Sequence, residues 1–406
     1  MCYVIIQQNL NKVEKMIERI HIENFKSIYD LEIDVGRVNL IIGENGAGKS
    51  NLLEALVFVS ANDSNKLDNE FLFSRGLREA KPELIRSAFD KNNENIKINI
   101  LLDNNENSSY EFKHDNSPYS SWMRTGTYKK ELLVNFGFDN NEFNLMKDDM
   151  TLKGDRNLEI YLSNLDNAKK YLSNIKNSFP INNIINFLIY SPENTALRTF
   201  EKEGQIQPLG INGEGLLKLL KVVNNYEDKS YINTIIKSLQ LFDWFEDISI
   251  PDSLSSGEDK VIIKDKYLYQ EIDQRSTNEG FLFILFYITL IVAKETPKAF
   301  AIDNVDASLN PKLCTKLMTI ITELAHKYDK QIFLTTHNPA ILDGIDLFDD
   351  EQRLFVISRS NKGHTKADRI EPPKGTTKED WEEQNYGLKL SDIWLSGAIG
   401  GMPKDF

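Results

Sequence analysis

The chain has 406 residues, of which 41% are hydrophobic and 27% charged, an ordinary globular composition with ample material for a core. The formal net charge of −13 excludes a surface that binds nucleic acid throughout, although one local basic groove stays compatible with it. The two cysteines, Cys2 and Cys314, lie far apart and match no metal-binding spacing, which predicts a reducing, cytoplasmic location.

The N-terminal part predicts the first half of an α/β core. Residues 1–15 lack the basic start of a signal peptide and are expected to be a disordered lead-in. Within 16–75, the segments ERIHIENF, LEIDV and VNLIIG alternate like strands. A helix with one apolar face is expected to follow from Lys49.

Residues 76–250 differ in character and are predicted to form a large inserted α+β region with a helical subdomain. The insertion is rich in Asn, Asp and Lys, and contains no internal repeat. Its strand-like pieces are IKINILLD and ELLVNFGF, and its helix-like pieces are EGLLKLLKVVNNY and YINTIIKSLQLF.

The regular pattern returns in 251–360, which predicts the second half of the core. A long apolar helix over 281–293 is too short for the roughly 20 residues that span a bilayer, so we expect it to be buried and expect no membrane segment. Strand AFAID, a helix over 310–328 and strand QIFLTTH follow. This succession predicts an α/β fold whose two halves flank the insertion.

The C-terminal tail, 361–406, contains a short apolar pattern. Leu388, Leu390, Ile393 and Trp394 can share one helical face. Two alternatives stay open: this face packs on its own domain, or it docks a partner protein.

A phosphate-binding loop stands between strand VNLIIG and the helix that follows it. The segment GENGAGKS satisfies G-x-x-x-x-G-K-S in the strand–loop–helix context that this motif needs. Lys49 is expected to neutralise phosphate charge, and the Ser50 hydroxyl to bind Mg²⁺. The predicted ATP-binding residues are Asn45, Gly46, Ala47, Gly48, Lys49, Ser50 and Asn51.

Two later strands end in residues suited to the same site. Asp303 ends the apolar strand FAID, where its carboxylate can reach the Mg²⁺ shell, so Ser50 and Asp303 are the predicted metal ligands. His337 ends the strand QIFLTTH and is expected near the γ-phosphate. The cofactors predicted from these motifs are ATP and Mg²⁺.

With these motifs the chain resembles ABC-type head ATPases, in the bacterial branch that includes the OLD family, RecF and the ATPase subunits of anti-phage defence systems. The resemblance is carried by IHIENFKS at 20–27, IIGENGAGKSNLLEAL at 41–56, AIDNVDASLNP at 301–311 and LTTHNPAILD at 334–343. It implies a P-loop ATPase head that forms a homodimer, or an oligomer of dimers, around two ATP molecules. It also places Lys26 beside the nucleotide.

In this family a signature helix of one subunit points at the γ-phosphate held by the other, and two segments compete for that role. The pentapeptide LSSGE at 254–258 matches the consensus, but a strand-like stretch follows it and its distance to Asp303 is about twice the family spacing. STNEG at 276–280 directly precedes the long apolar helix and has Ser followed by Glu as in a capping box. We therefore expect LSSGE to be a hairpin loop. The expected signature residues are Ser276, Asn278 and Gly280.

Asn304 departs from the family pattern, in which Glu follows the Walker B aspartate and polarises the attacking water. An amide orients water but cannot accept its proton, and losing such a base typically costs about 10²–10⁴ in rate. Either hydrolysis is very slow and ATP acts as a long-lived clamp, or His337 or Asp306 positions the water. The resemblance also places Asp306 where it can contact the other protomer. The predicted catalytic set is Asn304, His337 and Asp306.

The resemblance implies an ATP-binding regulatory subunit of a bacterial anti-phage defence system. The stretch after His337 is too short for the Toprim nuclease domain of the OLD family, so the effector is expected to be a separate chain, an HNH or Toprim nuclease. The alternative is an active RecF-like ATPase that binds duplex DNA in repair. The long insertion and the NFKS opening disfavour a transporter subunit.

Overall fold

The computed structural model describes most of the chain. The described residues are 16–64, 66–79, 81–89, 95–103, 105–117, 120–124, 183–200, 206–251 and 260–401. The expected lead-in 1–15, the strand-like piece ELLVNFGF and the pentapeptide LSSGE lie outside them. Within the described ranges, no helix is long and apolar enough to cross a membrane.

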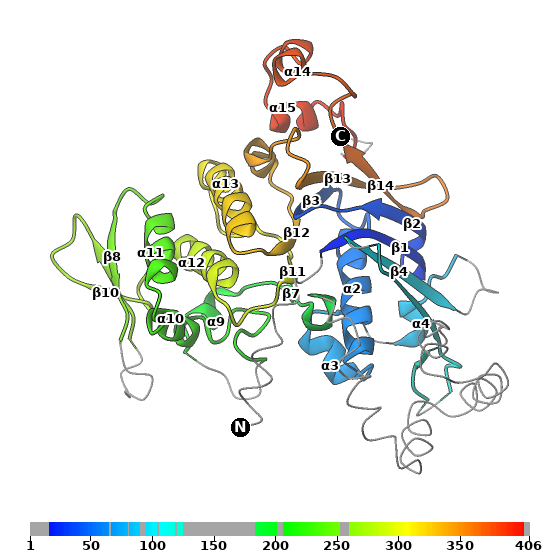
Figure 1. The fold of residues 1–406 in the computed structure, drawn as a ribbon, viewed down its shortest axis with the longest axis horizontal. Coiled ribbons are helices and arrows are strands. Elements are labelled where there is room, and N and C mark those ends of the chain that lie inside the picture. The colour runs from blue at the N-terminus through cyan, green and yellow to red at the C-terminus, as the bar shows by residue number, and fades with distance from the viewer. Residues whose placement is uncertain are drawn as a thin grey trace.

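A six-stranded sheet forms the centre of the molecule (Figure 1). Its strands, in spatial order, are β14 (Thr365–Ile370), β13 (Gln352–Arg359), β3 (Val38–Gly43), β12 (Gln331–Thr335), β11 (Ala299–Ile302) and β7 (Ile189–Tyr190). All neighbours pair in parallel except β14, which is antiparallel to β13. The central strands β3, β12 and β11 are buried along their whole length, as expected for parallel strands covered on both faces. Their carboxyl ends share one edge, where ligands bind in open α/β sheets.

A second sheet packs on one side of the first through helix α2 (Lys49–Asp63). This antiparallel sheet has the order β2 (Ile28–Asp34), β1 (Ile17–Phe25), β4 (Ile96–Leu102), β5 (Asn107–Lys113) and β6 (Met123–Arg124). Apolar residues of β1, β4, α2 and one face of the central sheet form a common core. Strands β4 and β5 come from the predicted insertion, so part of the insertion belongs to the same sheet as the N-terminal segment.

A helical lobe covers the opposite face of the central sheet (Figure 1). Its elements are α9 (Asn194–Leu197), α10 (Leu216–Asn224), α11 (Ser230–Leu239), α12 (Glu279–Val292), α13 (Pro311–Lys327) and a three-stranded sheet of β8 (Phe245–Ser249), β9 (Ile262–Asp265) and β10 (Ile272–Asp273). Helix α12 is apolar on every side and buried along almost its whole length, which confirms the predicted buried helix. The helix-like pieces of the insertion are confirmed as α10 and α11.

Shorter elements complete the described chain. They are α3 (Asn69–Ser74), α4 (Pro82–Ile85), the 3₁₀ helices η1 (Asn183–Asn186) and η2 (Pro339–Gly344), α14 (Lys378–Gln384) and α15 (Leu390–Leu395). In the tail, Ile393 and Trp394 are buried, and the Ser391 hydroxyl bonds the Asp343 carboxylate at 3.0 Å. Leu388 stays half exposed. Helix α15 therefore packs on its own domain, and docking of a partner by the rest of the tail stays a prediction.

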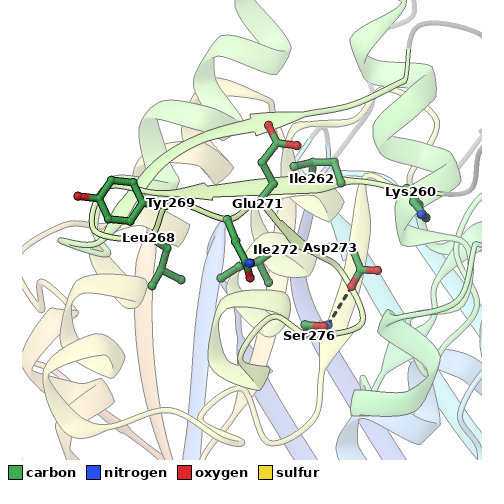
Figure 2. A pocket seen from close by; sticks show the side chains of 9 residues that line it. Lys260, Ile262, Leu268, Tyr269, Glu271, Ile272, Asp273 and Ser276 are labelled. Atoms are coloured by element: carbon green, nitrogen blue, oxygen red, sulfur yellow. Dashed lines mark hydrogen bonds between the residues drawn. The ribbon is translucent and has the colours of Figure 1, made fainter.

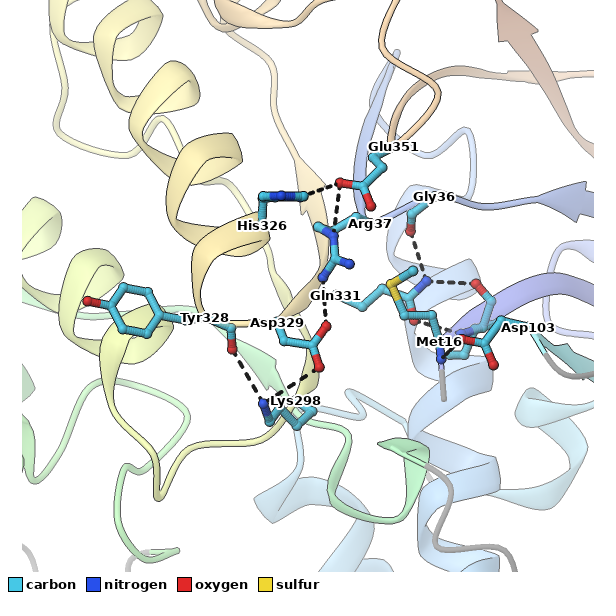
Figure 3. Close-up of polar contacts among 11 residues, drawn as sticks. Met16, Gly36, Arg37, Asp103, Lys298, His326, Tyr328, Asp329, Gln331 and Glu351 are labelled. Carbon is cyan, nitrogen blue, oxygen red and sulfur yellow. Dashed lines mark hydrogen bonds and ion pairs between the residues drawn. The ribbon is translucent and has the colours of Figure 1, made fainter. Parts of the chain in front are cut away.

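Polar contacts tie the two sheets together where β1 and β12 begin (Figure 3). The buried Gln331 amide donates to the carbonyls of Ile17 and Gly36 at 2.7 and 2.8 Å, and its oxygen accepts from the Ile17 N–H at 2.9 Å. Nearby, Arg37 binds the carboxylates of Asp329 and Glu351. These contacts hold together the end of the central sheet that lies opposite the phosphate loop.

Candidate nucleotide-binding site

The loop between β3 and α2 has the backbone that the glycine pattern predicts. Gly43, Gly46 and Gly48 all have positive φ, a region that residues with a Cβ rarely adopt. At Gly48 a Cβ would lie 2.3 Å from Thr365 Oγ1 and 2.8 Å from Ser27 Oγ, so only glycine fits there. At Gly46 a Cβ would meet nothing within 4 Å, which leaves the inside of the loop open.

Lys49 is buried at the base of this loop with its ammonium group turned back into it. Its Nζ donates to the carbonyls of Gly43 at 2.8 Å and Glu44 at 3.0 Å. Burial lowers the pKa of Lys49, while the carboxylate of Asp303 opposes that shift. Because main-chain carbonyls carry no full charge, the ammonium is held in place yet not neutralised, and it can still bind a phosphate.

Ser50 and Asp303 come together although they are far apart in the sequence. Ser50 Oγ lies 3.4 Å from Asp303 Oδ2, and the Thr335 hydroxyl donates to the other carboxylate oxygen. A hydroxyl and a carboxylate are the hard oxygen donors that Mg²⁺ prefers, so the pair fits that ion. The described residues contain no cluster of three His, Cys, Asp or Glu that could hold a metal. A magnesium ion here would therefore keep several waters or phosphate oxygens as ligands.

A cavity of about 280 Å³ lies over the loop and the carboxyl ends of β3, β11 and β12. It is lined by Asn45, Gly46, Gly48, Lys49, Ser50, Asn51, Arg78, Asp303, Asn304 and His337. All of these residues except Arg78 belong to the three motifs expected to bind ATP, so the fold brings the motifs together in one place. Ala47 lies beneath the loop instead, where its carbonyl accepts from the Thr365 hydroxyl at 2.9 Å.

A larger cavity of about 740 Å³ lies elsewhere, beside the β9–β10 hairpin (Figure 2). Its walls include Tyr269, Ile272 and Asp273, and Ser276 lies at its rim. Its lining includes no glycine-rich phosphate loop. The smaller cavity is therefore the candidate site for a nucleoside triphosphate.

Asn304 stands in the left-handed backbone region, with φ of 57°. Its N–H donates to Thr335 Oγ1 at 2.9 Å, and its side chain lines the cavity beside Asp303. Asparagine and aspartate tolerate this backbone region better than other residues with a Cβ. Asn304 thus lines the cavity next to the strand-end aspartate, on a backbone that suits it.

His337 and Asp306 are linked to each other. The Asp306 carboxylate accepts a hydrogen bond from the Thr336 hydroxyl at 2.7 Å. It also accepts one from the main-chain N–H of His337 at 3.3 Å. Burial lowers the pKa of His337 below its ordinary value, and the nearby Lys49 ammonium lowers it further. Both influences favour the neutral form of the imidazole. Asp306 is engaged within its own chain, and its expected contact with a second protomer stays a prediction.

The start of α12 corrects one sequence prediction. The N-cap is Asn278, whose side chain accepts from the Phe281 N–H at 2.9 Å, and not Ser276 of the expected capping box. Thr277 is buried and its hydroxyl bonds the Asp273 carbonyl, so the helix begins two residues later than the pattern indicated. Neither Ser276 nor Asn278 lines the small cavity.

Gly280 packs closely against the loop after Asp303. A Cβ at Gly280 would lie 3.2 Å from the Ser308 carbonyl, and the Ser308 hydroxyl donates to Glu279 at 2.6 Å. The segment LSSGE lies outside the described residues, but β9 follows it and pairs antiparallel with β8. The predicted strand after LSSGE is therefore confirmed.

Lys26 and Arg78 share one buried carboxylate. Glu54, with no exposed side-chain surface, forms ion pairs with the Lys26 ammonium and, at 2.8 Å, with Arg78 Nε. Lys26 does not line the cavity, so its role beside the nucleotide stays a prediction. Sequence reasoning missed Arg78, which does line it, because no motif marks a lone arginine in an irregular stretch.

Sequence reasoning also missed the strands β13 and β14 that support the loop from the other side. Arg359 Nε donates to the Gly46 carbonyl at 3.0 Å, and Thr365 is buried against Ser27 and Ala47. The signal that could have revealed β13 is the apolar run LFVI, all of which is buried.

The parallel sheet, the phosphate loop, the strand-end aspartate and the buried helix α12 together define an ATPase head of the ABC type. The family model described as "AAA domain, putative AbiEii toxin, Type IV TA system" matches residues 38–343, and the chain belongs to that family. The crystal structure of an SmcHead bound to the C-winged helix domain of ScpA shares the fold, with a TM-score of 0.54 at 14% identity over 87% of this chain and 98% of that one.

Several curated relatives share part of this sequence. The Septu protein PtuA of Bacillus mycoides is 24% identical over 86% of this chain and 43% of its own length. The uncharacterized protein MJECL10 of Methanocaldococcus jannaschii is 33% identical over 28% of this chain and 53% of its own. The DNA replication and repair protein RecF of Halalkalibacterium halodurans is 33% identical over 21% of this chain and 23% of its own. The chain spans about half, or less, of these relatives' length.

Proposed function

We propose that the protein is an ATP-binding, homodimerising regulatory subunit that holds ATP for a long time and controls a separate effector. The cavity over the phosphate loop supplies the binding residues for MgATP, with Lys49 for the phosphates and Ser50 and Asp303 for the metal. Two ATP molecules would lie between the phosphate loop of one protomer and the start of α12 of the other. Closure around them would shift the population of a conformation that the effector recognises.

Asn304 is the observation that carries the slow turnover. Its amide lines the cavity next to Asp303, where a general base would have to act, and an amide cannot accept a proton. His337 also lines the cavity, but burial and the Lys49 ammonium lower the pKa of its imidazole, which makes it a weaker base. The residues of the proposed site therefore favour binding of ATP over its hydrolysis.

The similarity to the Septu protein PtuA supports the proposed control of an effector. The alignment with the Septu protein PtuA extends over most of this chain, including the segments outside the shared motifs. We infer a cytoplasmic role in antiviral defence, with an HNH or Toprim nuclease on another chain as the effector. An oligomer built from dimers is compatible with this arrangement.

A hydrolysing DNA-repair ATPase that binds duplex DNA is the second candidate. The local similarity to RecF and to the Rad50 ATPase of Thermoplasma volcanium, 41% over 71 residues, favours it. The amide at position 304 and the net charge of −13 count against it, because repair turnover needs a base and DNA needs a basic surface.

Phosphate release from MgATP by the purified protein tests the proposal, with Lys49→Ala as the blank. Asn304→Asp is isosteric and suits the positive φ, whereas Asn304→Glu restores the family's longer base at some backbone strain. The wild type should match the blank within about twofold, and one of the two carboxylate variants should exceed it by about 10²-fold or more. Steady turnover by the wild type, with no gain in either variant, would remove the clamp and favour the repair candidate.

A further inference from the structure

Arg198, directly after α9, holds the loop that precedes α12. One guanidinium nitrogen donates to the carbonyls of Gln274 at 2.9 Å and Arg275 at 2.6 Å, and the other donates to the Thr277 carbonyl at 2.8 Å. A planar guanidinium presents its donors in a fixed fork, so three carbonyls on one group define the position of the loop. This loop carries Ser276, the expected signature serine.

The base of Arg198 is fixed as firmly as its tip. Its Nε donates to Asn194 Oδ1 at 2.8 Å within the same helical turn. The preceding residue, Leu197, is fully buried in the core that contains α12, and Gly213 leaves room for it, since a Cβ there would lie 2.5 Å from the leucine side chain. Arg198 therefore joins helix α9 and the loop before α12 into one hydrogen-bonded unit.

The other end of this unit adjoins the edge of the central sheet that carries Asp303. Strand β7 lies beside β11, and the Tyr190 carbonyl accepts from the Asp303 N–H at 2.8 Å. The chain then runs through residues 191–193, where the Glu193 N–H donates to the Asn212 carbonyl at 2.8 Å, directly into α9. A short path of covalent and hydrogen bonds thus joins Asp303 to the loop before α12.

The charge of Arg198 also suits an anion at this place. The N-terminus of α12 carries a partial positive charge, and a half-buried guanidinium beside it adds potential of the same sign. Such a cation is unfavourable next to a helix start unless carbonyls or an anion offset it. Here the three carbonyls partly offset the positive charge of the guanidinium. The remaining positive potential at the loop favours a nearby anion.

We propose that Arg198 is a positioning residue that couples nucleotide binding at Asp303 to the placement of Ser276 and Asn278. The inference rests on the proposed function, because the start of α12 meets a phosphate only in the ATP-held dimer. A shift of β7 and residues 191–193 on binding MgATP moves α9, and Arg198 carries that movement to the loop. Without Arg198 a protomer still binds ATP but presents the loop poorly to its partner.

The test compares Arg198→Met, Arg198→Lys and the control Arg275→Met. Arg275 is exposed on the same loop, and its substitution removes an equal charge while its carbonyl stays available to Arg198. Asp273 and Asn278 cap the loop and helix independently, so Arg198→Met should leave α12 folded. Each protein is titrated with a fluorescent ATP analogue, and its ATP-dependent dimerisation is measured by sedimentation velocity. Hydrogen exchange of amides 274–281 is followed with and without MgATP.

We expect Arg198→Met to bind the analogue within about twofold of the wild type and to dimerise at least about tenfold more weakly. Arg198→Lys should recover part of the loss, and Arg275→Met should match the wild type. Equal dimerisation of Arg198→Met and wild type overturns the inference, as does loss of ATP binding in Arg198→Met, which would show a merely structural role. If the wild type itself stays monomeric with ATP, the proposed dimer fails, and hydrogen exchange decides the coupling alone. A change in hydrogen exchange at amides 274–281 that MgATP causes in the wild type and that Arg198→Met abolishes supports the coupling. No MgATP-dependent change in the wild type overturns the coupling.

Discussion

The phosphate loop and the start of α12 both carry residues expected to contact ATP, but only the loop gathers its residues around one cavity. At the loop, a buried lysine and a hydroxyl from one segment and a carboxylate from another line a single cavity. At α12, the N-cap Asn278 and the exposed Ser276 stand apart from that cavity, and the cationic side chain beside them, Arg198, is bound to main-chain carbonyls. A helix start alone binds anions weakly, so it acts where a second site already holds the phosphate.

In the proposed dimer, this difference fits a role in which the start of α12 contacts the ATP that a second protomer holds. The loop is rigid because Gly48, Thr365 and Ser27 pack without spare room, whereas the α12 start depends on Arg198 for its placement. The proposed nucleotide-dependent dimer needs both kinds of site: a rigid phosphate loop that binds ATP, and an α12 start whose position can change when ATP binds.

The largest effect on ATP binding is expected at Lys49. Lys49→Ala removes the charge-assisted contact to the phosphates and should weaken ATP binding about 100-fold, the equivalent of about 3 kcal/mol. The fold should persist, because the lysine bonds only main-chain carbonyls of its own loop. Calorimetric titration with MgATP checks this, with the exposed Lys362→Ala as the control. Unchanged affinity would show that the loop is not the binding site.

Two glycines of the loop offer a matched pair for stability. Both have positive φ, but a Cβ at Gly48 would collide with Thr365 and Ser27 while a Cβ at Gly46 meets nothing. Gly46→Ala should lower the free energy of unfolding by about 1 kcal/mol through backbone strain alone. Gly48→Ala should lower it by about 3–4 kcal/mol through strain plus overpacking. Urea unfolding measures both, and equal losses would mean that the loop is not closely packed.

Substitutions at the start of α12 should have a smaller effect and leave the loop untouched. Asn278→Ala should lower the free energy of unfolding by about 1 kcal/mol, since it removes the N-cap bond to Phe281. Ser276→Ala should change it by less than about 0.5 kcal/mol. ATP affinity of the single protomer should stay the same in both. The reverse order of the two losses would restore Ser276 as the cap.

The smallest effect concerns the protonation of His337. Its pKa in the free protein should lie below the ordinary value of 6.5, because burial and the Lys49 charge disfavour the imidazolium. The folded state then binds fewer protons than the unfolded chain just below that value, so its contribution to stability is lost as pH falls through this window. NMR titration of the ring measures the pKa. Adding MgATP should raise it, and Lys49→Ala should raise it in the free protein. A pKa above 6.5 without nucleotide contradicts the placement.

Local patterns in the sequence were sufficient for the central part of the fold. The strands β1 to β3, the helix from Lys49 and the alternation of β11, α13 and β12 were predicted from periodicity and are confirmed. They could be predicted because buried strands and amphipathic helices carry their pattern in consecutive residues. The β13–β14 pair was missed, and the N-cap of α12 was placed two residues early, since Ser276 and Asn278 both suit a cap and only tertiary contacts choose between them.

The sequence by itself determined the chemistry of the phosphate loop, because all of its residues lie within one turn and one helix start. It also determined that Asn304 follows the strand-end aspartate, and with it the expectation of slow turnover. Only the tertiary structure decided which residues support that site. Glu54 between Lys26 and Arg78, Thr365 against the loop, and Arg198 on three carbonyls all join segments far apart in the chain. Such contacts leave no periodic trace, because a single arginine or threonine looks the same whether it faces water or holds a site together.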